Sequence, residues 1–216
     1  HQLYEGEWRD GFRHGMGTAS YDEGKSTILY TGEWYKDMRQ GYGTMKYASG
    51  NIYEGNWYAD KKCGKGVMTW VEDQSTYCGD WSNDLPNGGG EVLWSNLKIS
   101  KLVTKQMSSV YRGTLVDGEK AGEGSFIYAD GSQYSGQWAK DVKHGDGVVV
   151  LGNGSIEATK FQLGRQTNDK ANVNSSSSGS SNNNKTSKGD SPGAKKAQPS
   201  ASGSKDVKLS IDDLIR

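Results

Sequence analysis

Short stretches of alternating polar and apolar residues fill the first 166 positions of the chain, and they recur in pairs. The first stretch of a pair reads Tyr-x-Gly-x-Trp, as in Tyr30-Thr31-Gly32-Glu33-Trp34. The second reads Gly-x-Gly-x-apolar-x-aromatic, as in Gly41-x-Gly43-x-Met45-x-Tyr47. A period of two is typical of a β-strand, so each stretch predicts a strand and each pair predicts a hairpin.

The hairpin unit is repeated along the chain. Six units begin with a Tyr, at successive spacings of 26, 23, 24, 34 and 23 residues, and we expect a decayed seventh copy to begin at Ile156. Every Trp falls on a repeat position, as do nine of the 12 Tyr. Self-similarity at a nearly constant period is the signature of a repeat protein. The six units begin at Tyr4, Tyr30, Tyr53, Tyr77, Tyr111 and Tyr134.

The residues between the strands predict short turns. Asp10-Gly11 and Asp117-Gly118 lie between the halves of a unit, and Ser49-Gly50-Asn51 lies between two units. Such residues tolerate positive φ angles and close hairpins. Short links of both kinds predict an antiparallel meander of about thirteen strands. Gly within a strand often marks the close approach of another group, and we expect aromatic rings from neighbouring hairpins to cover these glycines.

Composition argues against a second layer of structure. Only 32% of the 216 residues are hydrophobic, while Gly supplies 31 residues. A chain so poor in aliphatic residues lacks the material for a thick core. We therefore predict an all-β fold: a single-layer, elongated, twisted, gutter-shaped antiparallel sheet with the aromatic side chains on one face.

This aromatic row is the candidate partner-binding groove. Packing of the rings on one another, purely as a core, is the competing interpretation. An exposed aromatic face on a single-layer sheet usually marks a contact surface. The candidate residues are Tyr4, Trp8, Tyr21, Tyr30, Trp34, Tyr47, Tyr53, Trp57, Trp70, Tyr77, Trp81, Trp94, Tyr111, Tyr128, Tyr134 and Trp138.

The expected organisation has five parts. Residues 1–94 hold repeats one to four, 95–110 an insertion, and 111–166 repeats five and six with the decayed copy that caps the sheet. Residues 167–204, rich in Ser, Asn and Lys, predict disorder because they cannot bury enough apolar surface. Residues 205–216 are a short terminal segment. The insertion contributes Lys98, Lys101 and Lys105 to a candidate anionic-lipid contact, and it is also a candidate hinge between two pieces of sheet.

No catalytic, metal or cofactor site is expected. His14 and His144 occupy a repeat position that elsewhere holds other residue types, which indicates a turn. Glu7, Glu33 and Asp80 are expected to face solvent. The Gly-x-Gly pairs lack the third glycine and the helix of a dinucleotide site. Two cysteines, Cys63 and Cys78, make no disulfide framework or four-ligand zinc site and favour a reducing, cytoplasmic compartment.

The charge balance gives no sign of nucleic-acid binding. The whole chain carries 26 basic and 26 acidic side chains. Of these, 18 basic and 21 acidic side chains lie in residues 1–166, which leaves 8 and 5 for the rest. Neither part has the dense basic stripe that binds nucleic acid, and no small-molecule substrate is expected.

The hairpin resembles the MORN (membrane occupation and recognition nexus) repeat. The resemblance covers about residues 3–165, with Leu115 in place of Trp in unit five and Leu151 in place of the closing aromatic in unit six. The stretch from Met68 to Tyr77 is similar to radial-spoke-head members. The resemblance implies an elongated hairpin sheet that serves as a scaffold, and such repeats occur in axonemal, junctional-membrane and cytoskeletal proteins.

Three functions are compatible with this pattern. The preferred one is a non-catalytic scaffold that binds a peptide, an amphipathic helix or a second copy of itself, in a ciliary or other cytoskeletal assembly. The second is a peripheral module on the cytoplasmic face of a membrane that binds anionic phospholipid. The third is a regulatory segment of a larger enzyme, such as a phosphatidylinositol phosphate kinase or a SET-type methyltransferase.

Overall fold

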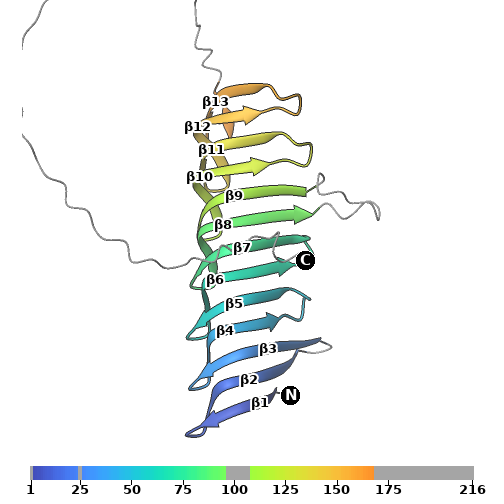
Figure 1. Cartoon of the computed structure of the whole chain (residues 1–216), viewed down its shortest axis with the longest axis vertical. Coiled ribbons are helices and arrows are strands. Elements are labelled where there is room, and N and C mark those ends of the chain that lie inside the picture. The colour runs from blue at the N-terminus through green and yellow to red at the C-terminus, as the bar shows by residue number, and fades with distance from the viewer. Residues whose placement is uncertain (1, 24–25, 96–107, 168–216) are drawn as a thin grey trace, which may run out of the picture. The chain divides into compact units, whose positions relative to one another are not determined.

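The computed structural model describes residues 2–23, 26–95 and 108–167 (Figure 1). These residues form one open antiparallel sheet of 14 strands whose spatial order is the chain order. The expected single-layer meander is therefore confirmed. The strands are β1 (Gln2–Arg9), β2 (Phe12–Glu23), β3 (Ser26–Tyr35), β4 (Met38–Lys46), β5 (Ile52–Tyr58), β6 (Lys61–Trp70), β7 (Ser75–Ser82), β8 (Leu85–Ser95), β9 (Ser108–Val116), β10 (Glu119–Ile127), β11 (Gln133–Ala139), β12 (Val142–Val150), β13 (Ile156–Gln162) and β14 (Arg165–Gln166).

Two-residue turns close the two halves of each unit along one edge of the sheet. Both residues have positive φ in all seven of these turns, as in Asp10-Gly11 and Lys36-Asp37. Turns of this geometry match the right-handed twist of the paired strands. Some of these turns begin with a residue other than the usual Asn, Asp or Gly. Examples are Lys36-Asp37, Ala59-Asp60 and Leu163-Gly164, in which both residues still have positive φ.

A β-bulge follows each of the first six turns at the first glycine of the Gly-x-Gly pair. The pairing of β3 with β4 shifts between Gly32 and Trp34, and Gly41 on the facing strand has φ +64°. An L-residue rarely adopts this conformation, which explains the glycine. The second glycine, Gly43, pairs directly with Gly32 of β3 and Gly55 of β5.

The sheet continues across the insertion. Strand β8 pairs with β9 from Gly88↔Leu115 to Ser95↔Ser108, which is as extensive as the pairing elsewhere. The strands that flank the insertion are thus adjacent, and their pairing gives no sign of the expected hinge. Lys98, Lys101 and Lys105 lie outside the described residues, as do the predicted disordered segment from residue 168 and the terminal segment 205–216.

The register of the seventh unit differs from expectation by one residue. Strand β12 pairs Val149 with Glu157, Gly147 with Thr159 and Gly145 with Phe161. Glu157 therefore takes the place of the repeat tyrosine, and Phe161 takes the place of the tryptophan. The decayed copy begins at Glu157 rather than at Ile156, and its spacing from Tyr134 is the usual 23 residues.

Candidate functional site

Each repeat tyrosine covers the pair of glycines in its own hairpin. Tyr30 is fully buried, and its hydroxyl donates a hydrogen bond of 3.0 Å to the carbonyl of Glu33 on the same strand. A Cβ added to Gly43 would lie 2.4 Å from the Tyr30 hydroxyl oxygen. A Cβ on Gly32 would lie 2.5 Å from the Cα of Gly43. The expected ring over bare backbone is present, but it comes from the same hairpin and not from a neighbouring one.

Four repeat tryptophans, Trp34, Trp57, Trp81 and Trp138, each join their hairpin to the preceding one. The indole N–H of Trp34 donates to the carbonyl of Gly17 at 3.1 Å, and that of Trp57 donates to Gly43 at 3.2 Å. Trp57 also makes edge-to-face contacts with Tyr30 and Tyr53, at centroid distances of 5.5 and 5.1 Å. Tyrosine thus closes a hairpin and tryptophan stacks hairpins, so the two residues have different roles within one aromatic ladder.

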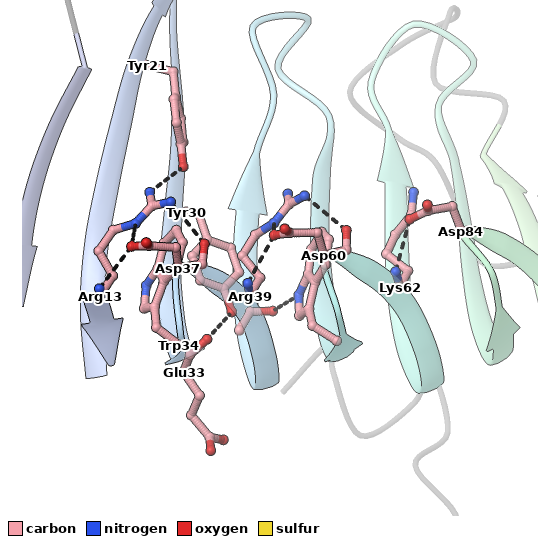
Figure 2. Close-up of polar contacts among 12 residues, drawn as sticks. Arg13, Tyr21, Tyr30, Glu33, Trp34, Asp37, Arg39, Asp60, Lys62 and Asp84 are labelled. Carbon is pink, nitrogen blue, oxygen red and sulfur yellow. Dashed lines mark hydrogen bonds and ion pairs between the residues drawn. The ribbon is translucent and has the colours of Figure 1, made fainter. Parts of the chain in front are cut away.

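A layer of cations lies above this ladder (Figure 2). The guanidinium carbon of Arg39 is 4.4 Å from the centroid of Trp57 in the next unit. Its Nε donates to Asp60 at 2.8 Å, and the same carboxylate oxygen accepts the backbone N–H of Arg39. In return, the Asp60 backbone N–H donates to the Arg39 carbonyl. Arg13 with Asp37 repeats this arrangement.

The Arg–Asp layer therefore links successive units by three kinds of contact. These are an ion pair, two reciprocal backbone contacts and a cation–π contact. The Arg39 and Asp60 side chains are 22% and 46% exposed, so solvent screens the ion pair and limits its contribution to at most about 1 kcal/mol.

The electrostatics of the ladder follow from burial. Burial raises the pKa values of Tyr30, Tyr53 and Tyr77, and it raises the pKa of Tyr111 to about 12. These hydroxyls are therefore neutral donors at any physiological pH. Burial also lowers the pKa of Lys62, an effect that Asp84 opposes.

The ladder is interrupted once, between units four and five. Leu115 stands in place of the stacking tryptophan, as the sequence indicated. Pro86 replaces the cation, and Gly118, which donates its N–H to the Pro86 carbonyl, replaces the aspartate. Proline has neither a charge nor a backbone N–H, so a carboxylate at position 118 would have no partner there. A cavity of about 400 Å³ opens at this point, lined in part by Trp70, Tyr77, Trp94, Leu115 and Pro86.

The predicted groove residues fall into two rows. The inner row is 0–7% exposed and forms the core, with the cation layer above it. It consists of Tyr30, Trp34, Tyr53, Trp57, Tyr77, Trp81, Tyr111, Tyr134 and Trp138. The outer row is half-buried and consists of the closing aromatics Tyr21, Tyr47, Trp70, Trp94 and Tyr128. On strand β1 Tyr4 is half-buried and Trp8 is 60% exposed.

The polar residues also differ from expectation. The Glu33 carboxylate accepts the N–H of Tyr42 at 2.8 Å, and Asp80 accepts that of Gly89 at 3.1 Å. Glu7 does the same for Met16. These acidic residues therefore cap the bulges rather than only face solvent. His14 and His144 lie within β2 and β12, next to the bulge glycines, and not in turns.

Sequence reasoning missed a second exposed aromatic surface. Tyr35 and Tyr58 each follow a buried tryptophan, so they point to the opposite face of the sheet. They are 43% and 66% exposed, and Tyr42, also on that face, is 51% exposed. The Tyr42 hydroxyl donates to Glu54 at 2.9 Å, and burial together with this bond raises its pKa to about 12. These three tyrosines alternate along the strands with the repeat positions, and this alternation could have placed them on the opposite face from the sequence alone.

The described residues contain no cluster of three or more His, Cys, Asp and Glu side chains placed to hold a metal ion. They also contain no helix long and apolar enough to cross a bilayer. The fold and the ladder define the class of protein: an open-sheet repeat protein whose units are joined by aromatic and cationic contacts.

Comparison with known proteins identifies the family. The MORN repeat matches residues 4–26, 30–52, 53–73, 77–96, 111–133 and 134–156, which together make up more than half of the chain. The chain therefore belongs to the MORN repeat family. The expected resemblance is confirmed, and the family consists in general of non-enzymatic repeat proteins.

Two relatives illustrate the range of proteins that carry such repeats. The chain is 35% identical over 78 residues to "MORN repeat-containing protein 3" of Xenopus laevis, which covers 33% of this chain and 29% of that protein. It is 29% identical over 98 residues to "Alsin" of Rattus norvegicus, which covers 45% of this chain and 6% of that protein. The chain thus spans less than a third of either relative.

Proposed function

We propose that this chain is a non-catalytic scaffold that binds a partner protein along the outer aromatic row. One observation carries the proposal: half-buried aromatic side chains recur at the same position of successive units on one face of an open sheet. No second layer from the described residues packs on that face. Tyr and Trp at partly covered, regularly spaced positions are the residue types that dominate protein interfaces.

The spacing of the outer row restricts the form of the partner. Successive units are two strands apart, or about 10 Å at the usual spacing between strands. In a peptide of polyproline II conformation every third residue lies on the same side at a spacing of about 9 Å, and in a helix every seventh residue repeats at about 10.5 Å. An amphipathic helix with apolar anchors at i, i+7 and i+14, or a peptide with anchors at every third residue, therefore matches three successive units.

The rigid inner ladder supports this role. Rings that stack in edge-to-face contacts and hydrogen-bond to backbone carbonyls hold the outer row in a fixed geometry before a partner arrives. Pre-organisation of this kind reduces the entropy lost on binding. A scaffold needs no catalytic group, which agrees with the general character of the family.

Paired substitutions on the two faces test the proposal. Trp70→Ala with Trp94→Ala removes two outer-row rings, and Tyr35→Ala with Tyr58→Ala removes two exposed rings from the opposite face as a matched control. Both proteins are cross-linked to partners in the cells of origin and their partners are compared by mass spectrometry. We expect the outer-row variant to lose the partners of the wild type and the control to keep them.

The opposite result, with partners lost only by the control, would move the interface to the Tyr35 surface. Retention of all partners by both folded variants would contradict the proposed interface on either aromatic face. A ciliary or cytoskeletal location, which the family resemblance suggests, forms part of the proposal, and imaging of the tagged full-length protein tests it. Binding to anionic phospholipid is one alternative, and it predicts binding of the chain to anionic vesicles. Service as a regulatory segment of a larger enzyme is another, and it predicts a catalytic domain in the same reading frame.

A further inference from the structure

Each lysine of the cation layer, Lys62, Lys120 and Lys143, occupies a slot with three aromatic walls, whereas Arg13 and Arg39 each lie over two rings. The Lys62 ammonium lies 5.9, 5.5 and 4.9 Å from the ring centroids of Tyr47, Tyr53 and Trp81. These rings are the closing aromatic of the preceding unit, the tyrosine of the same unit and the tryptophan of the next unit. The Lys120 ammonium lies 5.6 to 5.8 Å from the ring centroids at the same three repeat positions, which are Trp94, Tyr111 and Trp138. The repeat therefore builds a site for a positive charge, and in these units the chain fills it.

Unit four has this slot without its cation. Trp70 and Tyr77 occupy the first two wall positions, and Leu115 occupies the third. Pro86 stands where the other units have Arg or Lys, and Gly118 stands where the partners of Arg13, Arg39, Lys62 and Lys120 are aspartates; the partner of Lys143 is Gly164. The cavity of about 400 Å³ is lined by Trp70, Tyr77, Leu115, Pro86 and Gly118. This volume falls at the lower end of the range for ligand pockets, so the cavity is large enough for one long side chain.

The charges around the slot favour a cationic guest. Three charged side chains line it: Asp73, Asp141 and Lys120. Lys120 is paired with Asp141 at 2.7 Å, so its charge is compensated. Asp73 is exposed and adds a negative charge to the rim. Indole and phenol rings attract cations through their faces, so the aromatic walls and the Asp73 carboxylate on the rim both favour binding of a cation.

We propose that this slot binds an Arg or Lys side chain of a partner protein, which takes the place that Arg39 or Lys62 occupies in other units. The bound side chain would complete the ladder across its single interruption. The slot lies beside Trp70 and Trp94 of the outer row, so a partner seated on that row can supply the cation. The proposal rests on the proposed scaffold function for the source of the side chain, whereas the slot itself can be tested with small molecules.

A titration of the full chain with amino-acid derivatives tests the charge requirement. N-acetyl-arginine amide is the probe. The citrulline derivative has nearly the same shape without the charge, and the norleucine derivative is purely apolar. The indole N–H resonances of Trp70 and Trp94 are followed by NMR. We expect these two resonances to shift with the arginine probe, with a dissociation constant in the millimolar range, roughly threefold to tenfold below that of citrulline.

Three variants link the signal to the slot. Pro86→Arg with Leu115→Trp and Gly118→Asp supplies the missing ladder contacts within the chain, and we expect it to fold at least as stably and to lose the probe signal. Trp70→Leu removes one wall and should weaken binding by a similar factor to the loss of charge. Trp8→Leu, on strand β1, is the matched control and should bind like the wild type. A background with Lys98, Lys101 and Lys105 changed to Gln prevents competition by lysines of the same chain.

Equal affinity for arginine, citrulline and norleucine would overturn the proposal in favour of an apolar slot. Undiminished binding by the triple variant, or shifts confined to other tryptophans, would place the probe elsewhere. The two proposals fail separately. Partner capture that depends on the outer row without any probe binding refutes only the slot, whereas probe binding without such capture refutes only the scaffold interface.

Discussion

Removal of one stacking tryptophan is the most direct test of how the sheet is held together. Trp57 is 3% exposed and contacts two tyrosine rings, the Arg39 guanidinium and the Gly43 carbonyl. Trp57→Leu reproduces in unit three the residue that unit five has naturally at position 115. The substitution leaves the strands, the turns and the glycines unchanged, so it tests the contact between hairpins alone.

The expected cost is the sum of three contributions. Truncation of a buried Trp to Ala costs about 3–5 kcal/mol, and a leucine that fills part of the space reduces this to about 2 kcal/mol. Loss of two edge-to-face contacts adds about 1–2 kcal/mol, and the Gly43 carbonyl left without its indole donor adds about 1 kcal/mol. We therefore expect a loss of about 4 kcal/mol in the free energy of unfolding.

Urea unfolding followed by far-ultraviolet circular dichroism measures this loss. Tyr58→Leu is the matched control because Tyr58 is the next residue, points to the other face and is 66% exposed; we expect a change within about 0.5 kcal/mol. Trp57→Phe should lie between the two. A loss below about 1 kcal/mol for Trp57→Leu would show that the ladder does not carry the stability of the sheet.

Four further outcomes follow from the same geometry. Gly66→Ala should destabilise by more than about 2 kcal/mol in the same assay, because its Cβ would lie 2.4 Å from a tyrosine hydroxyl and the overpacked ring must move. Gly131→Ala, with open space around it and φ +84°, should cost only about 1 kcal/mol from its backbone conformation. Asp60→Ala removes an acceptor from Arg39 at a half-exposed site, and we expect a loss of about 1 kcal/mol, measured by urea unfolding and reduced at high salt. The raised tyrosine pKa values make a stabilising contribution that is fully present below pH about 10 and is lost as the pH rises through the folded-state values. Over that range the free energy of unfolding, measured in urea, should fall by about 1.4 kcal/mol per pH unit for each buried tyrosine. A flat profile from pH 9 to 11 would contradict this reasoning.

The repeat pattern allowed the fold to be predicted closely, but it did not show which rings a partner can reach. Tyr53 and Tyr47 both looked like groove residues, yet Tyr53 lies beneath Trp57 and Trp81 while Tyr47 remains half-exposed. Exposure depends on what the adjacent hairpin places above a ring. The cation layer was missed for a similar reason, because Arg39 and Asp60 stand 21 positions apart and become partners only when two hairpins stack.

Local rules were sufficient for the strands, the hairpins and the order of the sheet. The alternation of side chains, the turn residues and the positions of the glycines all act within one unit. They can therefore be read from the sequence of that unit alone. The assignment of the seventh unit was wrong by one residue because Glu157 and Thr159 have lost the local markers, and only pairing with β12 restores the register. The empty slot beside Leu115 is also a property of the assembled sheet: its walls come from three successive units, and no single unit holds enough of them to reveal it.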